Sequence, residues 1–349
     1  MILTKSPYYI TVPLDISAEK YILEIYVWSG LKASVPASAT YEIENKNPLG
    51  RTGDSKVDIS NYINDALTVG LESDSTTNVI DSNSAIWVKT QVIDYISDVA
   101  QTPRLVSTDL AIKGFGYGIE GENTTIPSNN ILANGSSVNV NRTSNFTLPI
   151  KVSETVTTVV RVTSYPNNEI SKAFPISATT NSDELIKNVF VKCSETTFDT
   201  SIEIDVDDVI YELIIKDELR YTPIDIWYHN KYGQLYSLTF FKDKTESLKV
   251  ESENYESSVG QAINGVHQFE KFNTNGKTEF KINSGWLKET NNELFKQLFL
   301  SDKVWHFDGT TFIPLNLKSQ SIEYKTRQRD RLINYEISFE YAFYEVNNI

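Results

Sequence analysis

Residues 20–28 read KYILEIYVW, and this stretch shows the pattern that decides the fold. It is rich in β-branched and aromatic side chains, and both charged residues, Lys20 and Glu24, fall on the same face. A period of two is typical of a half-buried β-strand, because successive side chains of a strand point to opposite faces. We therefore predict a strand at 20–28, and the same period recurs along the chain.

The first hundred residues repeat this pattern, with turn residues between the runs. We predict further strands at 8–12, 39–44 and 85–94. Between the last two, the segment SNYINDAL predicts a short helix. Ser60 is its expected N-cap, and its expected apolar face comprises Tyr62, Ile63, Ala66 and Leu67. Strands joined by turns, with one short helix, favour a sandwich-like module.

The middle of the chain is richer still in alternating runs. We predict strands at 137–142, 145–152, 155–165, 188–194 and 208–217, with a turn at 165–168. Their density favours a second β-sandwich of immunoglobulin-like type. The chain has one cysteine, Cys193, so the disulfide of immunoglobulin domains is absent and only the general architecture is predicted.

The last third predicts a further β domain with the best helix of the chain. Its expected strands are 224–230, 235–242, 246–255, 303–309, 310–319 and 333–346. Asn275-Gly276 is the sequence signature of a tight hairpin turn. From Thr290 the sequence predicts a helix near 290–301, capped by Thr290 or Asn291. Its apolar face comprises Leu294, Phe295, Leu298 and Phe299.

The chain is thus expected to be mainly β, with two β-sandwich-like domains followed by a C-terminal β domain that carries one amphipathic helix. The expected domains are residues 1–108, 109–217 and 218–349, since 349 residues exceed one ordinary core. Hydrophobic residues make up 40% of the chain and aromatic residues 11%, which is ample for packed cores and argues against global disorder.

Charge and composition exclude several classes of function. The formal net charge of −14 argues against nucleic-acid binding, which depends largely on clustered Lys and Arg. One cysteine and three histidines, with no spacing typical of metal ligands, predict no metal and no cofactor. The absence of 18 consecutive apolar residues predicts no membrane span, and the N-terminus reads as a strand rather than a signal peptide. We expect synthesis in the host cytoplasm.

Four features could carry chemistry, and each has a structural alternative that we favour. Gly114, Gly116, Gly118 and Gly121 resemble a phosphate loop, but no helix follows, so a Gly-containing strand or hairpin is preferred. Asp205 and Asp207, on one face of a strand with Asp208 on the other, could bind calcium or form a glycosidase pair. A solvated strand or turn is preferred there.

The remaining candidates are histidine and cysteine side chains. His229 and His306 lie beside aromatic residues in predicted strands, without a Ser or Cys partner, so a structural histidine is preferred to a general base. Cys193 lies in a predicted strand, and a buried inert thiol is preferred to a nucleophile. No catalytic triad, Walker loop or metalloprotease motif is present, which predicts that the chain is not an enzyme.

A basic run, KTRQRDR, occupies residues 325–331 of this acidic chain. It could pair with carboxylates of a neighbouring copy and so help to set ring or stack geometry. Contact with DNA is a less favoured reading, and a plain solvated loop remains open.

Two stretches carry a resemblance to a known class of protein. Residues 224–244 read IDIWYHNKYGQLYSLTFFKDK: an aromatic strand, an Asn-Lys-Tyr-Gly turn and a second strand ending in Phe-Phe-Lys. They resemble a motif in virion proteins of tailed bacteriophages that infect Bacteroidetes. Residues 283–325, followed by LINYEISFEYAF at 332–343, resemble the closing domain of those proteins. The segments SPYYI at 6–10 and IYVWSG at 25–30 add a less specific likeness.

The resemblance implies a structural subunit of the virion tail, baseplate or head-to-tail neck, found in the virion and repeated around the phage axis. Its partners would be copies of itself in a ring or stack and other virion proteins. We expect interface or domain-organising roles for aromatic and Arg side chains, which supply much interface energy: Trp227, Tyr232, Trp286, Trp305, Arg327, Arg329 and Arg331. The alternatives are a receptor or glycan-binding module and a carboxylate-based hydrolase.

Overall fold

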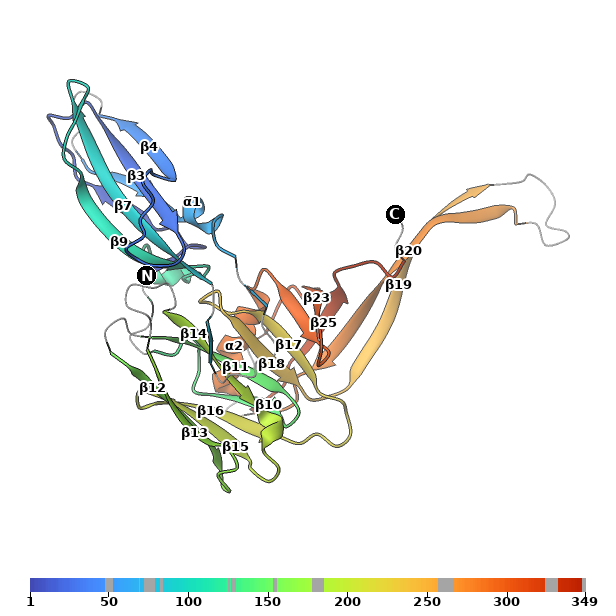
Figure 1. The fold of residues 1–349 in the computed structure, drawn as a ribbon. Helices are drawn as coiled ribbons and strands as arrows, with labels where there is room; N and C mark the ends of the chain where they lie inside the picture. The colour runs from blue at the N-terminus through green and yellow to red at the C-terminus, as the bar shows by residue number, and fades with distance from the viewer. Residues whose placement is uncertain are drawn as a thin grey trace. The chain divides into compact units, whose positions relative to one another are not determined.

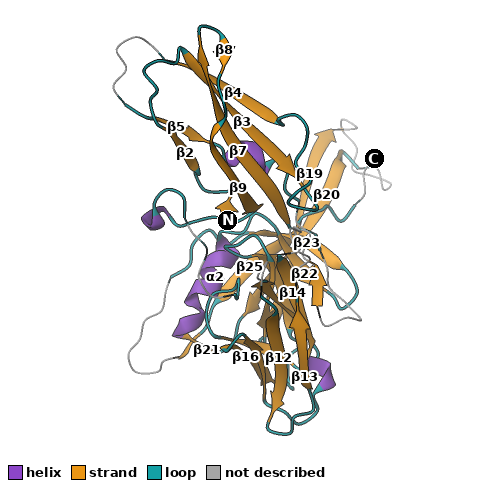
Figure 2. Ribbon diagram, turned by 60° about the vertical axis from the view of Figure 1, so that its left-hand side comes forward, coloured by secondary structure: helices purple, strands orange, loops and turns teal. Residues whose placement is uncertain are grey.

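We analysed a computed structural model of the full chain. It describes residues 1–47, 53–68, 70–71, 79–81, 84–124, 126, 130–152, 156–177, 185–256, 267–323 and 332–346. The fold is mainly β, as predicted, and strands account for most of the drawn elements (Figure 2). The chain divides into two compact units. Unit 1 comprises residues 1–215 and 229–236, and unit 2 comprises residues 216–228 and 237–349.

The first sheet of unit 1 is built on the strand predicted at 20–28. Its order is β1-β9-β7-β3-β4, and β8 pairs with the far end of β7. The bounds are β1 Ile2–Leu3, β9 Arg104–Ile112, β7 Ala85–Ile96, β3 Lys20–Trp28, β4 Tyr41–Lys46 and β8 Val99–Ala100. The pairs are antiparallel except for the parallel pair β1 and β9.

Each face of this sheet carries a buried apolar cluster. Tyr21, Leu23 and Ile25 of β3 belong to one buried cluster, together with Ile63 of α1 (Ser60–Asn64). Tyr26 and Trp28 belong to a second cluster, on the other side of the strand. The period of two in KYILEIYVW thus places side chains in two apolar cores. β2 (Tyr9–Val12) and β5 (Ser55–Asp58) form a short antiparallel pair, and β5 directly precedes α1 in the sequence.

The predicted cap of α1 is wrong. The N-cap position is Ile59, whose side chain makes no capping hydrogen bond. Ser60 instead begins the helix, and both its backbone N–H and its hydroxyl donate to the Asp58 carboxylate. Of the expected apolar face, Ile63 and Leu67 are buried, whereas Tyr62 is exposed.

Unit 1 contains two further sheets. One has the order β10-β16-β15-β12-β13, and the other has the order β11-β14-β6. The bounds are β10 Ser137–Asn141, β16 Val209–Lys216, β15 Ser201–Val206, β12 Thr158–Tyr165, β13 Ser171–Ile176, β11 Asn145–Lys151, β14 Ile186–Lys192 and β6 Val79–Asp81. Because β6 pairs with β14, segments from the first two predicted domains share one sheet.

Unit 2 is a seven-stranded antiparallel sheet with a helix. The strand order is β18-β17-β22-β23-β25-β20-β19. Figure 1 labels the strands of this sheet other than β22. The bounds are β18 Leu235–Phe240, β17 Ile224–His229, β22 Val304–Phe307, β23 Phe312–Leu317, β25 Glu336–Tyr341, β20 Phe269–Asn283 and β19 Lys244–Glu256. A short pair, β21 (Leu287–Lys288) and β24 (Leu332–Ile333), completes it. The strand predicted at 333–346 is therefore interrupted, since β24 ends at Ile333.

The helix α2 (Asn292–Phe299) lies where the sequence predicts it. Leu294, Phe295 and Leu298 are buried, and the Phe295 ring lies 6.0 Å from Phe240 and 4.8 Å from Tyr335 between centroids. Asn291 occupies the N-cap position, but its side chain makes no capping hydrogen bond.

The predicted hairpin at Asn275-Gly276 is wrong. Both residues lie inside β20, opposite Glu251 and Val250 of β19. Asn273 has a positive φ of 49°, and the register shifts between Glu251 and Glu253. The Asn-rich segment therefore forms a β-bulge, in which an extra residue is accommodated within a continuing strand.

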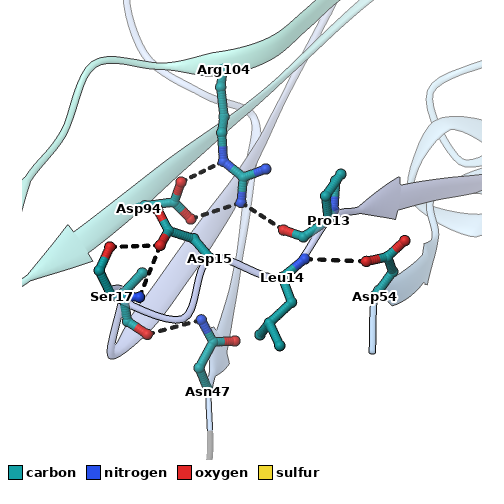
Figure 3. Close-up of polar contacts among 9 residues, drawn as sticks. Pro13, Leu14, Asp15, Ser17, Asn47, Asp54, Asp94 and Arg104 are labelled. Atoms are coloured by element: carbon teal, nitrogen blue, oxygen red, sulfur yellow. Dashed lines mark hydrogen bonds and ion pairs between the residues drawn. The ribbon is translucent and has the colours of Figure 1, made fainter. Parts of the chain in front are cut away.

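One polar network in unit 1 joins the segment after β2 to β7 and β9 (Figure 3). The Arg104 guanidinium donates two hydrogen bonds to the buried Asp94 carboxylate and a third, at 3.0 Å, to the Pro13 carbonyl. Asp15 accepts from the N–H and hydroxyl of Ser17. Bidentate pairing with a carboxylate holds the guanidinium in one orientation, and the pairing raises the pKa of Arg104.

We expect Arg104→Met to lower the free energy of unfolding by about 1–3 kcal/mol, because it leaves the buried Asp94 carboxylate without its donor. The control is Arg161→Met, since Arg161 forms a more exposed pair with Asp205 and should cost less than about 1 kcal/mol. Urea unfolding followed by circular dichroism measures both. Equal losses for the two variants would contradict a special role for Arg104.

Candidate functional site

The structure divides the predicted aromatic interface residues into two groups. Trp227 and Trp305 are buried in unit 2, and Tyr232 is buried in unit 1. Trp286, in contrast, is 63% exposed. Trp227 packs edge-on against Phe307 and Phe312, so its contacts lie within the sheet of its own chain. Among these aromatic residues, Trp286 is the one whose ring is available to a partner.

Tyr232 belongs to the turn Asn230–Gln234, which is held inside unit 1. The Asn230 side chain donates to the Leu132 carbonyl at 2.8 Å and accepts from the N–H of Tyr232 at 2.9 Å. Gly233 has a positive φ of 68°, and a Cβ there would lie 2.2 Å from the Lys113 carbonyl oxygen. The turn predicted at Asn-Lys-Tyr-Gly is therefore present, and its packing requires glycine.

The predicted basic run, including Arg327, Arg329 and Arg331, lies outside the described residues. Its assignment as an interface stays a prediction.

The carboxylates at 205–208 form a hairpin turn. Val206 of β15 pairs with Val209 of β16, and the two residues between them, Asp207 and Asp208, both have positive φ. Asp207 accepts from the Asn130 side chain and the Val159 N–H. The prediction that Asp205 and Asp207 share a strand face is therefore wrong. Asp can adopt the left-handed conformation that a two-residue hairpin needs.

Two other predicted features have structural roles. The glycine-rich segment after β9 is a loop leading to the 3-10 turn η1 (Gly118–Glu120), so the expected strand or hairpin is wrong. A Cβ on Gly114 would lie 2.8 Å from the Lys231 carbonyl oxygen, so this loop needs glycine for close backbone approach. Cys193 is buried, as predicted, but it begins the 3-10 turn η2 (Cys193–Glu195) rather than lying in a strand.

His306 borders a pocket of about 490 Å³ in unit 2. Its lining includes Tyr221, Lys242, Lys244 and Asp308. These charged groups already have partners in the chain: Lys242 pairs with Glu218 at 2.8 Å, Lys244 pairs with Glu246, and Asp308 accepts from Thr310 and Thr311. Burial, and then the positive charge of Lys244, lower the pKa of His306. The charged groups that line the pocket are therefore engaged within the chain, and its environment favours the neutral form of the His306 imidazole.

The remaining observations concern His229, groups of possible metal ligands and membrane-spanning helices. His229 is buried at the end of β17. Within the described ranges, no group of three or more His, Cys, Asp or Glu side chains could hold a metal ion. No helix in the same ranges is long and apolar enough to cross a membrane.

The most unusual surface is the ribbon formed by β19 and β20, whose far ends project beyond the other strands of their sheet (Figure 1). All 13 residues of β19 are exposed, and so are the first six of β20. Large apolar side chains lie among them: Leu248, Val250, Tyr255, Phe269 and Phe272. Isolated exposed apolar residues are ordinary, but here they occur in neighbouring pairs: Leu248 and Val250 share one face of β19, and the rings of Tyr255 and Phe272 lie 5.7 Å apart between centroids. Such exposed pairs favour an interaction surface.

The outer edge of the ribbon also has unpaired backbone groups. β19 ends the strand order, and within the described residues it pairs with β20 alone. Gly276 lies opposite Val250, and its carbonyl accepts from the Glu345 N–H at 2.9 Å, on the side away from β19. Two residues directly opposite each other in an antiparallel pair either exchange backbone hydrogen bonds or both point their N–H and C=O groups away from the partner strand. Val250 therefore directs its own N–H and C=O toward the free edge.

Sequence reasoning missed this ribbon as a site. The alternation of ESLKVESENY predicts a strand with one buried face, and Leu248 and Val250 do share a face. In this chain nothing among the described residues buries them, since they are 58% and 53% exposed. A sequence signal that could have indicated it is the combination of high charge and alternation in the segment 244–256.

Comparison with known proteins adds no family to this description. No protein-family model, curated protein or solved structure matched the chain.

The lowered pKa of His306 leads to a testable dependence of stability on pH. As the pH falls, the unfolded state binds a proton at this imidazole before the folded state does. The stabilising contribution is therefore present above the ordinary pKa of about 6.5 and is lost as the pH falls below it. We expect the free energy of unfolding to decrease between about pH 7.5 and pH 5.5.

We expect His306→Phe to reduce that decrease, because it removes the titrating group and keeps an aromatic ring beside Phe280. His267→Gln, at an exposed residue, is the control and should retain the wild-type decrease. Carboxylates with a lowered pKa, such as Asp308, act only at more acidic pH. Denaturant titrations over this pH range measure the difference, and identical profiles for His306→Phe and wild type would contradict it.

Proposed function

We propose that the chain is a structural subunit of a tailed-phage virion, located in the tail, baseplate or head-to-tail neck, and that it acts by assembling with other chains. The observation that carries the proposal is the exposed ribbon of β19 and β20, with its five large apolar side chains and its free edge. A function exercised by protein–protein contact explains why such a surface is present.

The energetics of the ribbon support assembly. Apolar area exposed to water contributes stability once a partner covers it, at roughly 25 cal/mol per Å². An exposed edge strand can also form backbone hydrogen bonds with another chain. The ribbon combines both features, and its Lys and Glu side chains keep the free subunit soluble before assembly.

The virion class is supported by the resemblance of residues 224–244, 283–325 and 332–343 to tailed-phage virion proteins. The net charge of −14 fits a subunit that contacts proteins rather than the packaged genome. Expected partners are copies of the chain in a ring or stack and other virion proteins.

The decisive experiment is to look for the chain in particles. Mass spectrometry of purified virions should detect it at several copies per particle, and antibody labelling viewed by electron microscopy should locate it on the tail or neck. Its absence from intact virions, with known tail proteins detected in the same sample, would refute the proposal.

Trp286 offers a second test, since its ring is exposed. We expect Trp286→Ala to weaken association by about 1–4 kcal/mol while changing the free energy of unfolding by less than about 1 kcal/mol. Trp286→Phe, which keeps an aromatic ring, should retain most of the association. Trp227→Ala is the contrasting variant, because removing a buried Trp should cost about 3–5 kcal/mol of folding stability. Normal assembly of Trp286→Ala would remove this residue from the interface.

A further inference from the structure

We infer that the free edge of β19 pairs with the same edge of a second copy of this chain, antiparallel and about a two-fold axis at Val250. This inference goes beyond the proposed function, because it names the surface and the partner and does not need the virion. It follows from three properties of the strand: its length and regularity, the direction of its backbone groups, and the order of its charges.

The edge is long and regular enough to pair. β19 spans 13 residues, Lys244–Glu256, without proline. The β-bulge adds its extra residue to β20, since Glu251 and Glu253 face Asn275 and Phe272. The outer side of β19 therefore keeps an even spacing of peptide groups. Bulges and prolines are two of the devices that protect an edge, and neither interrupts this strand. Charged side chains, which this strand does carry, are a third, and they disfavour pairing where a register opposes like charges.

The backbone direction selects residues that can lie at the centre. Because Val250 turns its N–H and C=O outward, two copies of Val250 can face each other and exchange both hydrogen bonds. A two-fold axis perpendicular to the sheet passes through the middle of such a pair. Leu248 then lies opposite Ser252 of the second copy, and Lys244 lies opposite Glu256.

The charges favour this register. With Val250 at the centre, Lys249 lies opposite Glu251 of the second copy, and the symmetry repeats the contact. In each chain these two side chains already form an ion pair at 2.9 Å. The pairing would place four charges of alternating sign side by side. Opposite charges facing each other across strands are favourable, and like charges are unfavourable.

Neighbouring registers lack this complementarity. A shift of the axis by one residue places Lys249 opposite Lys249, or Glu251 opposite Glu251. Centring on Ser252 places Glu251 opposite Glu253, and centring on Leu248 produces no Lys–Glu pair at all. Of the registers centred between 248 and 253, the one at Val250 alone sets Lys against Glu with no like charges opposed.

The same register covers exposed apolar side chains. Leu248 and Val250 lie on one face of β19, and both are more than half exposed in the single chain. Across the axis, Val250 faces Val250, with Leu248 diagonal to it on each side. Two pairs of apolar side chains thereby become one continuous strip. Burial in this dimer explains why apolar residues occupy positions 248 and 250, which are exposed to solvent in the single chain.

The test uses charge reversal in the full chain, followed by sedimentation equilibrium. Wild type should dimerise at about 100 μM, where contacts of micromolar affinity are populated. Lys249→Glu and Glu251→Lys should each raise the dimer dissociation constant by about tenfold or more, because each places like charges opposite each other twice. The double variant K249E/E251K should recover dimerisation, since it restores opposite charges with their positions exchanged.

Mixing the two single variants gives the most specific result. Lys249→Glu carries two acidic residues at the contact and Glu251→Lys carries two basic ones, so the mixture should form a heterodimer although each variant alone is weakened. Lys271→Glu, the same charge change on β20, and Glu253→Lys, which faces Ser247 in this register, should leave dimerisation unchanged.

Hydrogen exchange supplies a second readout. The amide of Val250 should be protected in the dimer and exchange rapidly in the weakened variants. A wild-type chain that stays monomeric at about 100 μM would overturn the inference. So would variants that all dimerise alike, or a mixture that forms no heterodimer. A chain that dimerises as described but is absent from virions would refute the virion proposal alone. A chain that is found in virions but stays monomeric in solution would refute the pairing alone.

Discussion

The need of every backbone N–H and C=O for a hydrogen-bond partner shapes this molecule more than any side chain does. In a chain that is mainly strand, those partners come from neighbouring strands. An open sheet therefore has two edge strands, and the N–H and C=O groups on the outer side of each have no partner within the sheet. In the sheet of unit 2 the strand order ends at β19. Because β19 is an edge strand of 13 residues, a long row of its N–H and C=O groups is left for hydrogen bonds with another chain.

Side-chain packing holds the interior, and it explains where the aromatic residues lie. Cys193 is the single cysteine of the chain and can form no disulfide within it. The sheet of unit 2 instead packs rings against rings: Phe240 contacts Phe295 and Phe339 edge-on, and Phe280 stacks on Phe339. Such pairs add specific geometry to the burial of large apolar area. Trp227 and Trp305 are buried and belong to this aromatic core, whereas the Trp286 side chain is exposed to solvent.

The sequence predicted strands well where both faces of a sheet are covered or where alternation is strict, as at β3, whose bounds agree with the prediction. It failed where backbone conformation depends on a partner strand. Asn275-Gly276 has the composition of a tight turn, but the positive φ lies at Asn273, and the strand continues past it as a bulge. Asp207-Asp208 lacks glycine and still forms the two-residue turn, because Asp can adopt the positive φ that the turn needs, and the Asp207 carboxylate accepts hydrogen bonds from Asn130 and Val159.

The site was harder to predict than the fold for a related reason. A period of two indicates that one face of a strand is buried, but it does not say by which chain. In β3 the covering residues belong to the same chain, as Tyr21 and Trp28 show from opposite faces. In β19 the same kind of pattern places Leu248 and Val250 on one face, where the described residues leave them exposed. The apolar face of β19 has the pattern of a buried strand face but is exposed in its own chain. We therefore infer that another chain buries it.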